Sequence, residues 1–204
     1  MIMKSGEGYT GVRPYRMRAR AEAAEKRTAR ILDAAVQLWR ERWYDEITLE
    51  DLVARSGVSA STILRRFGSK EEILAAVIAA DPLGVVRGRD RIAVGDVDAA
   101  VRELIEHYEQ VGDAVIRDLA LEERIPAIGQ AVRRGRALHR DFCARVFSAW
   151  LPRRRGPAYD RRLAQFIVAT DVYTWKLLRR DHGLGRAEAA RAMRELLDRL
   201  MQEG

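Results

Sequence analysis

Apolar residues recur at steps of three and four along most of the chain, which is the period of an amphipathic α-helix. The most regular stripes predict helices over residues 23–42, 96–125, 129–150, 159–180 and 186–202. The interval between residues 48 and 80 is divided into shorter segments and predicts three further helices. The sequence therefore predicts an all-α protein.

The shorter segments begin with Thr48 to Lys70, which has the pattern of two short helices joined by a tight turn. Thr48 can cap the first helix, because its hydroxyl accepts a hydrogen bond from a free backbone N–H of the first turn. Gly57 ends that helix, because glycine enters the left-handed conformation at no steric cost. This pattern is typical of a helix-turn-helix, whose second helix enters the major groove of DNA. The alternative is a helical hairpin that only adds to a core.

The second helix of the pair has two different faces. Ile63 and Phe67 lie four residues apart and are predicted to face the core. Small, hydroxylated and cationic side chains occupy another face and can approach bases and phosphates closely. They are Ala60, Ser61, Leu64 and Arg65.

Positive charge is concentrated before and within this stretch. The chain has 37 Lys+Arg and 30 Asp+Glu residues, a net charge of +7. Residues 1–70 contain 14 basic and 9 acidic residues, whereas residues 71–204 contain 23 and 21. Such an excess on a helix-turn-helix is expected of a protein that binds nucleic acid. A general preference for arginine would explain why most of these cations are arginine, but not where they lie.

Residues 1–22 are predicted to form a flexible basic arm. Glycines and a proline interrupt regular structure there, and arginines recur at every second or third residue. Such arms reach into the minor groove beside a helix-turn-helix; a solubilising tail is the alternative. The residues concerned are Gly6, Gly8, Gly11 and Pro14, together with Arg13, Arg16, Arg18 and Arg20.

Residues 27–74 resemble, without gaps, the N-terminal domain of the TetR-type transcriptional repressors. The similarity rests on the order and spacing of Ile31-Leu32, Ala34-Ala35, Thr48, Gly57-Val58-Ser59, Thr62-Ile63, Phe67 and Ser69-Lys70-Glu71. It implies three helices, a linking helix, and an all-helical domain that binds a ligand and forms a dimer. We therefore predict a DNA-binding domain over residues 23–70 and a ligand-binding and dimerisation domain over residues 71–204.

The resemblance also implies which residues contact DNA. It assigns phosphate contacts to Thr48, Thr62, Arg66 and Lys70, and base contacts to Ala60, Ser61, Leu64 and Arg65, with Ser59 beside them. Leu64 stands where the family usually has tyrosine, and Gly68 where it often has proline. The operator sequence of a relative therefore cannot be transferred to this chain.

In the C-terminal half, side chains on the long helices are candidates for an effector pocket, because helical bundles bind ligands in mostly apolar cavities between helices. Each candidate also fits an ordinary core position. His139 and Cys143 lie four apart on one helix face, but two ligands are too few for a metal site. We predict a packed or hydrogen-bonded pair there, no metal and no cofactor. The effector candidates are Tyr108, Ile116, Leu119, His139, Phe142, Cys143, Phe166 and Tyr173.

The last two helices form an antiparallel amphipathic pair. On their own they would close the core, and the resemblance implies that they also form a four-helix interface with a second subunit. The predicted interface residues are Phe166, Thr170, Leu177, Met193, Leu196, Leu197 and Leu200.

Other classes of function lack their motifs. The sequence has no G-x-S-x-G, H-E-x-x-H, P-loop or dinucleotide-binding pattern, so no enzymatic activity is predicted. The single cysteine, Cys143, excludes an internal disulfide. The longest apolar run, residues 73–80, is far short of the roughly 20 residues of a membrane span. No signal peptide is evident, so a cytoplasmic protein is expected.

These features together predict a homodimeric repressor that binds a roughly palindromic double-stranded DNA operator and responds to a small-molecule effector. The alternatives are an activator, and a small-molecule sensor or dimerisation module that no longer binds DNA specifically.

Overall fold

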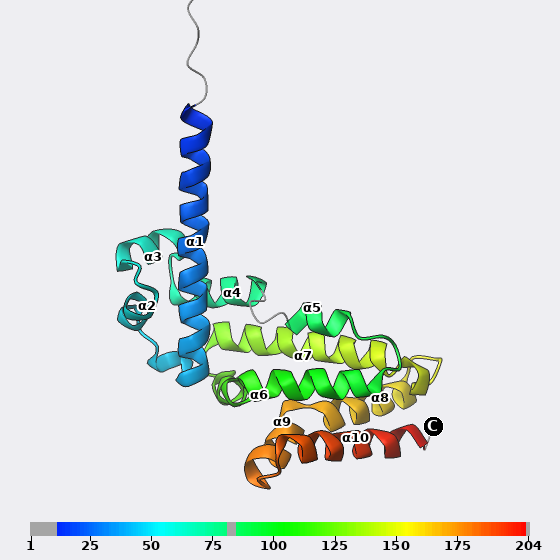
Figure 1. The fold of residues 1–204 in the computed structure, drawn as a ribbon. Helices are drawn as coiled ribbons and strands as arrows, with labels where there is room; N and C mark the ends of the chain where they lie inside the picture. The colour runs from blue at the N-terminus through cyan, green and yellow to red at the C-terminus, as the bar shows by residue number, and fades with distance from the viewer. Residues whose placement is uncertain (1–11, 81–84, 203–204) are drawn as a thin grey trace, which may run out of the picture.

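Helices make up nearly all of the chain in this computed structural model, which describes residues 12–80 and 85–202 (Figure 1). The N-terminal helices are α1 (Val12–Glu41), α2 (Leu49–Ser56), α3 (Ala60–Phe67) and α4 (Lys70–Ala80). The C-terminal helices are α5 (Val85–Asp90), α6 (Val97–Leu121), α7 (Pro126–Val146), α8 (Pro157–Thr170), α9 (Val172–Lys176) and α10 (Arg186–Gln202). Short helical turns lie at Tyr44–Glu46, Ser148–Trp150 and Leu177–Asp181. The described residues contain no strand, so the prediction of an all-α fold is confirmed.

The N-terminal helices enclose a small core of their own. Helices α2 and α3 lie on one side of α1, and α4 lies on the other (Figure 1). The apolar residues of α1 and α2 meet the inward side of α3, as their spacing predicts. The buried members are Ile31, Leu38, Ile47, Leu52, Val58, Ile63 and Ile73.

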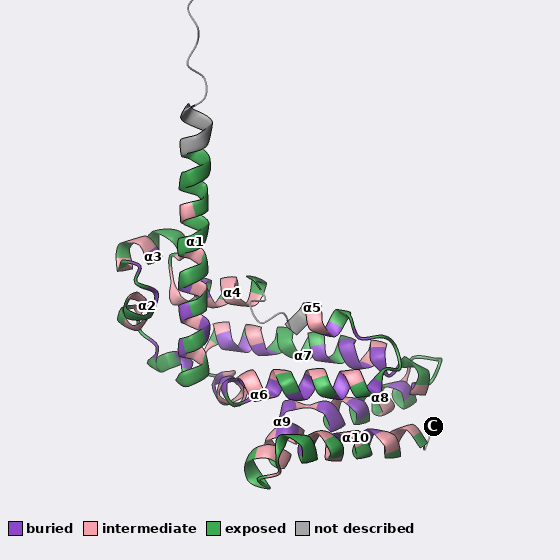
Figure 2. Ribbon diagram, in the orientation of Figure 1, coloured by how far each residue is buried: buried purple, intermediate pink, exposed green. Residues whose placement is uncertain are grey.

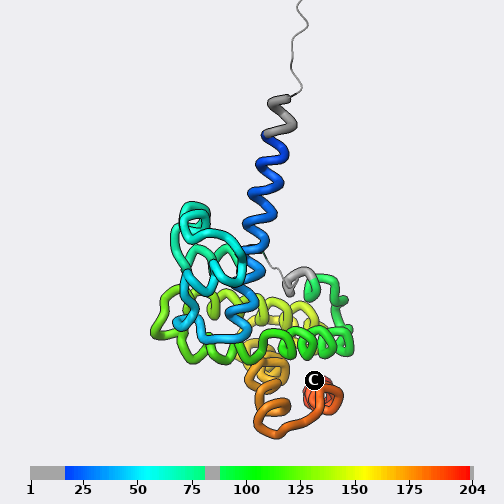
Figure 3. The backbone as a smooth tube through the Cα atoms, turned by 60° about the vertical axis from the view of Figure 1, so that its left-hand side comes forward, coloured from blue at the N-terminus to red at the C-terminus, as the bar shows by residue number. Residues whose placement is uncertain are grey.

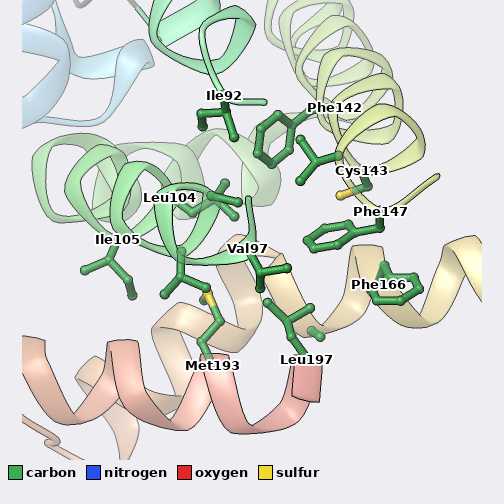
Figure 4. Packing of buried hydrophobic residues seen from close by; sticks show 14 of the residues in the cluster. Ile92, Val97, Leu104, Ile105, Phe142, Cys143, Phe147, Phe166, Met193 and Leu197 are labelled. Carbon is green, nitrogen blue, oxygen red and sulfur yellow. The ribbon is translucent and has the colours of Figure 1, made fainter. Parts of the chain in front are cut away.

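A larger core holds the C-terminal helices together. Figure 4 shows how side chains from α6, α7, α8 and α10 converge there. Phe147 and Phe166 stack with their ring centroids 4.6 Å apart. Met193 and Leu197 project from α10 towards α6 and are fully buried. The predicted apolar stripes of these helices are therefore used to build one core.

The prediction of a flexible arm is wrong for residues 12–22, because α1 begins at Val12; residues 1–11 lie outside the described residues. Residues 19–27 are rich in alanine, arginine and glutamate, which favour helix formation. Pro14 lies in the first turn, where a missing N–H breaks no helical hydrogen bond. Residues 17–22 of α1 project beyond α3 and are exposed (Figures 2 and 3).

The predicted helix boundaries differ from the structure in two further places. The hydrophobic pattern predicts no helix over residues 85–95, yet α5 occupies Val85–Asp90. The guanidinium of Arg145 donates to the carbonyls of Arg89 and Ile92, each at 2.6 Å, and so satisfies orphan groups at the end of α5. That partner comes from α7, more than 50 residues away, and local sequence gives no sign of it.

The helix expected over residues 159–180 is interrupted at Asp171. Its backbone is extended there, with φ −73° and ψ 156°, and its Oδ1 accepts from the N–H of Tyr173 at 2.9 Å. Asp171 therefore caps a new helix, α9, because a side-chain carboxylate at this position competes with helix continuation. No helix in the described part of the chain combines the length and the apolar character that a membrane span needs.

Candidate nucleic-acid interface

A reciprocal capping box fixes the start of α2. The Thr48 Oγ1 accepts from the N–H of Asp51 at 3.1 Å, and the Asp51 Oδ2 accepts from the N–H of Thr48 at 3.0 Å. Arg42 adds an ion pair to Asp51 at 2.9 Å. The bonds from Thr48, followed by the nearby Arg42 cation, lower the pKa of the Asp51 carboxyl. The predicted cap is confirmed, and it joins α2 to the end of α1.

The turn between α2 and α3 depends on Gly57. Its φ is +64°, and its N–H donates to the carbonyl of Val53 at 2.9 Å. A side chain at this φ would be strained. The next residue, Val58, is only 4% exposed and fills the corner between the two helices. The angle between α2 and α3 is therefore set by a glycine conformation and one buried side chain.

The helix α3 presents most of the predicted base-contacting residues on one open face. Ile63 is fully buried, whereas Leu64 is 47% exposed. Ser61 and Arg65 are exposed on the same side, one helical turn apart. Ala60 is half-buried. The exposed Leu64 side chain between hydroxyl and cationic groups suits contact with a thymine methyl group.

The residues predicted to hold phosphates flank this face. Thr48 and Arg66 are exposed, and Thr62 is half-buried. The Nε of Arg66 donates to the Thr28 hydroxyl of α1 at 3.2 Å. Ser59 occupies the N-cap position of α3, but its Oγ donates to the Thr62 Oγ1 at 3.0 Å and does not cap the helix. Exposed cations extend the surface along α1, namely Arg18, Arg20, Lys26, Arg27 and Arg30.

Lys70 lies differently from the other predicted phosphate contacts. Its Nζ donates to the carbonyls of Tyr44 at 2.8 Å and Ile47 at 3.0 Å, and it lies 4.3 Å from the centre of the Tyr44 ring. Burial lowers the pKa of the ammonium, an effect that nearby Glu71 and Asp45 oppose. In this conformation Lys70 ties α4 to the segment between α1 and α2. Its contact with phosphate stays a prediction.

We expect Lys70→Met to lower the free energy of unfolding by about 1–3 kcal/mol, because two carbonyl groups lose their charged donor. Urea denaturation measures this change, and titration with duplex DNA measures affinity in parallel. Arg66→Met is the matched control at an exposed cation. It should weaken DNA binding and change stability by less than about 0.5 kcal/mol. A Lys70→Met protein of unchanged stability that binds DNA weakly would show that the ammonium turns outward to phosphate.

A clamp joins the end of α1 to α6, and sequence reasoning missed it. The Trp39 Nε1 donates to the Asp118 Oδ2 at 2.8 Å. Arg117 donates to the carbonyls of Trp39 and Arg40, both at 2.9 Å. Burial raises the pKa of Asp118 to about 6, against the opposing effects of Trp39 and Arg117. The hydrogen-bonded residues of α1 and α6 are more than 75 residues apart in sequence, so no local motif predicts these contacts.

Four buried polar residues of the C-terminal bundle form one hydrogen-bonded cluster. The Tyr108 hydroxyl donates to the Thr170 carbonyl at 3.0 Å, and the His139 Nε2 lies 3.1 Å from the Thr170 Oγ1. The Cys143 Sγ lies 3.4 Å from the Thr170 Oγ1 and 3.7 Å from the His139 Nε2. Burial lowers the pKa of His139 to about 3 and raises that of Cys143 to about 11. The predicted hydrogen-bonded pair of His139 and Cys143 is present.

The other effector candidates occupy different environments. Phe142 and Phe166 are buried in the core, and Ile116 and Leu119 pack against it. Tyr173 is 52% exposed on the outer surface, so its placement in an internal pocket is wrong. An open groove of about 850 Å³ between α6, α10 and residues 91–96 is lined by other residues. Most of the side chains that were predicted to line an effector pocket therefore lie in or against the hydrophobic core.

Arg89 on α5 is a buried cation that sequence reasoning also missed. It is 9% exposed, and its guanidinium lies over the Phe142 ring at 5.4 Å. Within the part of the chain that the structure describes, the Arg89 Nε and the His139 Nδ1 lack hydrogen-bond partners. Arginine keeps its charge when buried, so such a site is costly unless something pairs with it.

The predicted dimer residues divide into two groups. Phe166, Thr170, Met193 and Leu197 are fully buried within the single chain, so their assignment to an interface is wrong. Phe166, Met193 and Leu197 pack in the C-terminal core, against other helices of the same chain. Leu177 and Leu196 are 52% and 45% exposed, and Leu200 is half-buried. Val168, which is 65% exposed, lines one groove with Leu196 and Leu200 and was missed by the prediction.

The N-terminal domain contains a helix-turn-helix whose second helix is exposed and carries cationic side chains, and a helical bundle follows it. This arrangement is typical of DNA-binding regulators. Residues 31–77 match the family model of bacterial regulatory proteins of the tetR family. This match confirms the resemblance to TetR-type regulators that the sequence predicts over residues 27–74.

Curated relatives agree with this class. An HTH-type transcriptional repressor of Mycobacterium tuberculosis is 29% identical over 109 residues, which cover 52% of this chain and 57% of that protein. An HTH-type transcriptional regulator of Mycobacterium bovis matches to the same extent. The chain thus spans little more than half the length of these relatives.

Solved structures share the fold. A transcriptional regulator of Pseudomonas aeruginosa superposes with a TM-score of 0.65 at 16% identity, covering 87% of this chain and 91% of that one. A TetR-family transcriptional regulator of Mesorhizobium loti superposes with a TM-score of 0.59 at 14% identity, covering 88% and 96%. At these identities the likeness concerns the fold alone. It extends over both the N-terminal helices and the C-terminal bundle.

Proposed function

We propose that the protein is a homodimeric, sequence-specific transcriptional repressor that acts in the cytoplasm. The observation that carries this proposal is the open face of α3, where Ser61, Leu64 and Arg65 lie together on a helix held by Thr48 and Gly57. The match of residues 31–77 to the tetR family supports DNA-binding regulation. The repressor role is supported by the description of the Mycobacterium tuberculosis relative.

The proposed mechanism follows from the two-fold symmetry of a dimer. Two copies of α3 would enter successive major grooves, about 34–36 Å apart, on an inverted repeat. Arg65 can donate to the N7 and O6 of a guanine, and Leu64 can contact a thymine methyl group. Thr48, Thr62 and Arg66 would hold phosphates and fix the register without reading sequence.

We also propose that a small-molecule effector controls this binding through α4. Ile73 of α4 belongs to the core of the DNA-binding domain, while Leu74 packs against Tyr44 and Leu121 at the junction with the bundle. Movement of the bundle would therefore be passed to α2 and α3. The Arg89 Nε and the His139 Nδ1, which have no hydrogen-bond partner among residues 12–80 and 85–202, support an effector site beside them. The effector must bind the two arrangements with different affinity.

Selection from a pool of random duplexes tests the proposed function. The protein is incubated with the pool at moderate salt, and the bound duplexes are sequenced. Enrichment of an inverted repeat with half-sites about one helical turn apart supports the proposal. A folded, dimeric protein that enriches no sequence would contradict it and would favour a sensor without specific DNA binding.

We expect Arg65→Ala to relax the base preference at one position of each half-site and to cost about 1–3 kcal/mol in binding at that base pair. Competition between the selected operator and its single-base variants measures this preference. Arg66→Ala is the control, because loss of a phosphate contact weakens binding to all sequences nearly equally. Unchanged selectivity in Arg65→Ala would show that the face of α3 has been assigned wrongly.

A further inference from the structure

A small apolar cavity lies where the DNA-binding helices meet the C-terminal bundle. Its volume is about 100 Å³. Apolar side chains of α1, α2 and α4 form most of its wall, including Ala35, Leu52 and Val77. An apolar cavity of about 150 Å³ in another protein stays dry and binds benzene. The cavity at the junction is smaller than that one, so it can admit at most one small ring.

Two buried polar residues, Tyr44 and Asp118, line the same cavity, and the Tyr44 hydroxyl is unpaired. Tyr44 is 5% exposed, and within the described residues its hydroxyl has no hydrogen-bond partner. Asp118 is 7% exposed, and its Oδ2 accepts from the Trp39 Nε1, which also lines the cavity. A buried hydroxyl without a partner carries its full desolvation cost. Such an exception among otherwise satisfied groups is typical of a functional site.

We propose that this cavity binds a small phenol-like molecule, which is an apolar ring of about benzene size with one hydroxyl group. Lys70 also lines the cavity, but its ammonium already donates to the carbonyls of Tyr44 and Ile47, so the charge of an anionic ligand would be desolvated with few free partners. The hydroxyl of the ligand can accept from Tyr44 and donate to Asp118, so it completes the pairing that the chain leaves open. This site is separate from the effector site proposed beside Arg89, and it does not depend on DNA binding.

An occupant would hold the two parts of the protein in one arrangement. The wall contains residues of α1 and α2 from the DNA-binding domain, residues of the linking helix α4, and Asp118 of α6. A ligand that contacts all of them binds this arrangement more tightly than one in which α1 has moved away from α6. Occupancy therefore strengthens the clamp between Trp39 and Asp118.

Nuclear magnetic resonance of the full-length protein, titrated with phenol, benzene and benzoate, tests the site without DNA. The probe is the indole N–H signal of Trp39, assigned with a Trp39→Phe variant. Phenol should move this signal and raise the melting temperature. Benzene should bind about fivefold more weakly, because it lacks the hydrogen bond, and benzoate should have no effect. A Trp39 signal that millimolar phenol leaves unmoved would overturn the proposal.

Two matched tyrosine variants test the recognition of the hydroxyl. Tyr44→Phe should raise the melting temperature of the free protein, because it removes an unpaired buried hydroxyl, and should reduce the preference for phenol over benzene, because only the hydrogen bond to Asp118 remains. Tyr108→Phe should lower the melting temperature, because that hydroxyl donates to the Thr170 carbonyl, and should leave phenol binding unchanged. A Tyr44→Phe protein that keeps the full preference for phenol, or melts at a lower temperature, would contradict the proposed chemistry.

A cavity-filling variant checks the place of binding. Val77→Phe puts a ring into the space and should prevent the shift of the Trp39 signal with both phenol and benzene. If phenol still moved the signal in this variant, its binding site would lie elsewhere. Failure of the protein to select an operator would leave all these results unaffected, so the two proposals stand or fall separately.

Discussion

Leu196→Glu is expected to convert the protein into a monomer and to lower its affinity for the selected operator by at least about 100-fold. Leu196 is 45% exposed on α10, and Val168 of α8 and Leu177 are exposed with it. Leu196 borders two shallow grooves on this surface, one beside Leu178 and one beside Val168. A cluster of exposed apolar residues around grooves of this kind is typical of an interface between subunits.

The size of the effect follows from two costs. A carboxylate buried between two apolar helix pairs loses its hydration without gaining a partner. Once the dimer is lost, each half-site is bound separately, and the gain from linking two binding events disappears. Sedimentation analysis reports the oligomeric state, and a mobility shift on the operator reports affinity.

The matched control is Leu138→Glu, the same substitution at a leucine of α7 that is 38% exposed. This protein should remain a dimer with the affinity of the parent. A dimeric Leu196→Glu protein with full operator affinity would place the interface on another surface and refute the proposed role of α8 to α10.

Gly112→Val is expected to lower the free energy of unfolding by more than about 3 kcal/mol. Gly112 lies within α6 and is buried against the indole of Trp175, where a Cβ atom would overlap the ring. The glycine interrupts the apolar stripe of this helix, and the sequence indicates only a weak point or a bend. The structure shows that it allows α9 to approach α6 closely.

The Trp175 ring cannot move aside at low cost. It is fully buried, its Nε1 donates to the Glu109 Oε1 at 2.9 Å, and Arg180 lies 4.6 Å from its ring centre. Glu109 is held in turn by Arg179, and the paired guanidinium lowers the pKa of the carboxyl to about 2. Displacement of the ring would therefore disturb packing and an ion pair together. Urea denaturation followed by circular dichroism measures the loss.

Gly135→Ala provides the matched control. Gly135 lies in α7 at an exposed position, and a Cβ there meets nothing within 4 Å. The substitution should stabilise the protein by about 0.5–1 kcal/mol, because alanine loses less conformational entropy in a helix. If Gly112→Val unfolded at the same urea concentration as the parent, the close contact between α6 and α9 would be wrong.

The helix-turn-helix is the part of the protein that could be predicted residue by residue. Its determinants act over fewer than ten residues, and each uses a local property of one amino acid. Thr48 caps α2 because its hydroxyl reaches a backbone N–H three residues ahead. Gly57 adopts a positive φ that disfavours other residues. The family match is to this region for the same reason.

The hydrogen bonds of Lys70 could not be predicted from neighbouring residues. Its position at the start of α4, next to the predicted DNA-binding surface, indicates a phosphate contact. Only the folded chain places the carbonyls of Tyr44 and Ile47 within reach of its ammonium. The same applies to Arg89 and Asp118, whose burial depends on helices that are remote in sequence.

The sequence by itself therefore determined the all-α class, the positions of most helices, and the helix-turn-helix with its exposed second helix. It did so because helical periodicity, capping and glycine conformation are properties of neighbouring residues. Tertiary structure alone decided which apolar residues of α8 to α10 are buried and which remain exposed. It also decided that the effector candidates other than Tyr173 lie in or against the core, and that a cavity at the junction is lined by Tyr44, whose hydroxyl has no partner among the described residues. An apolar stripe indicates only that one face of a helix is buried. Which residues pack against that face depends on the tertiary structure.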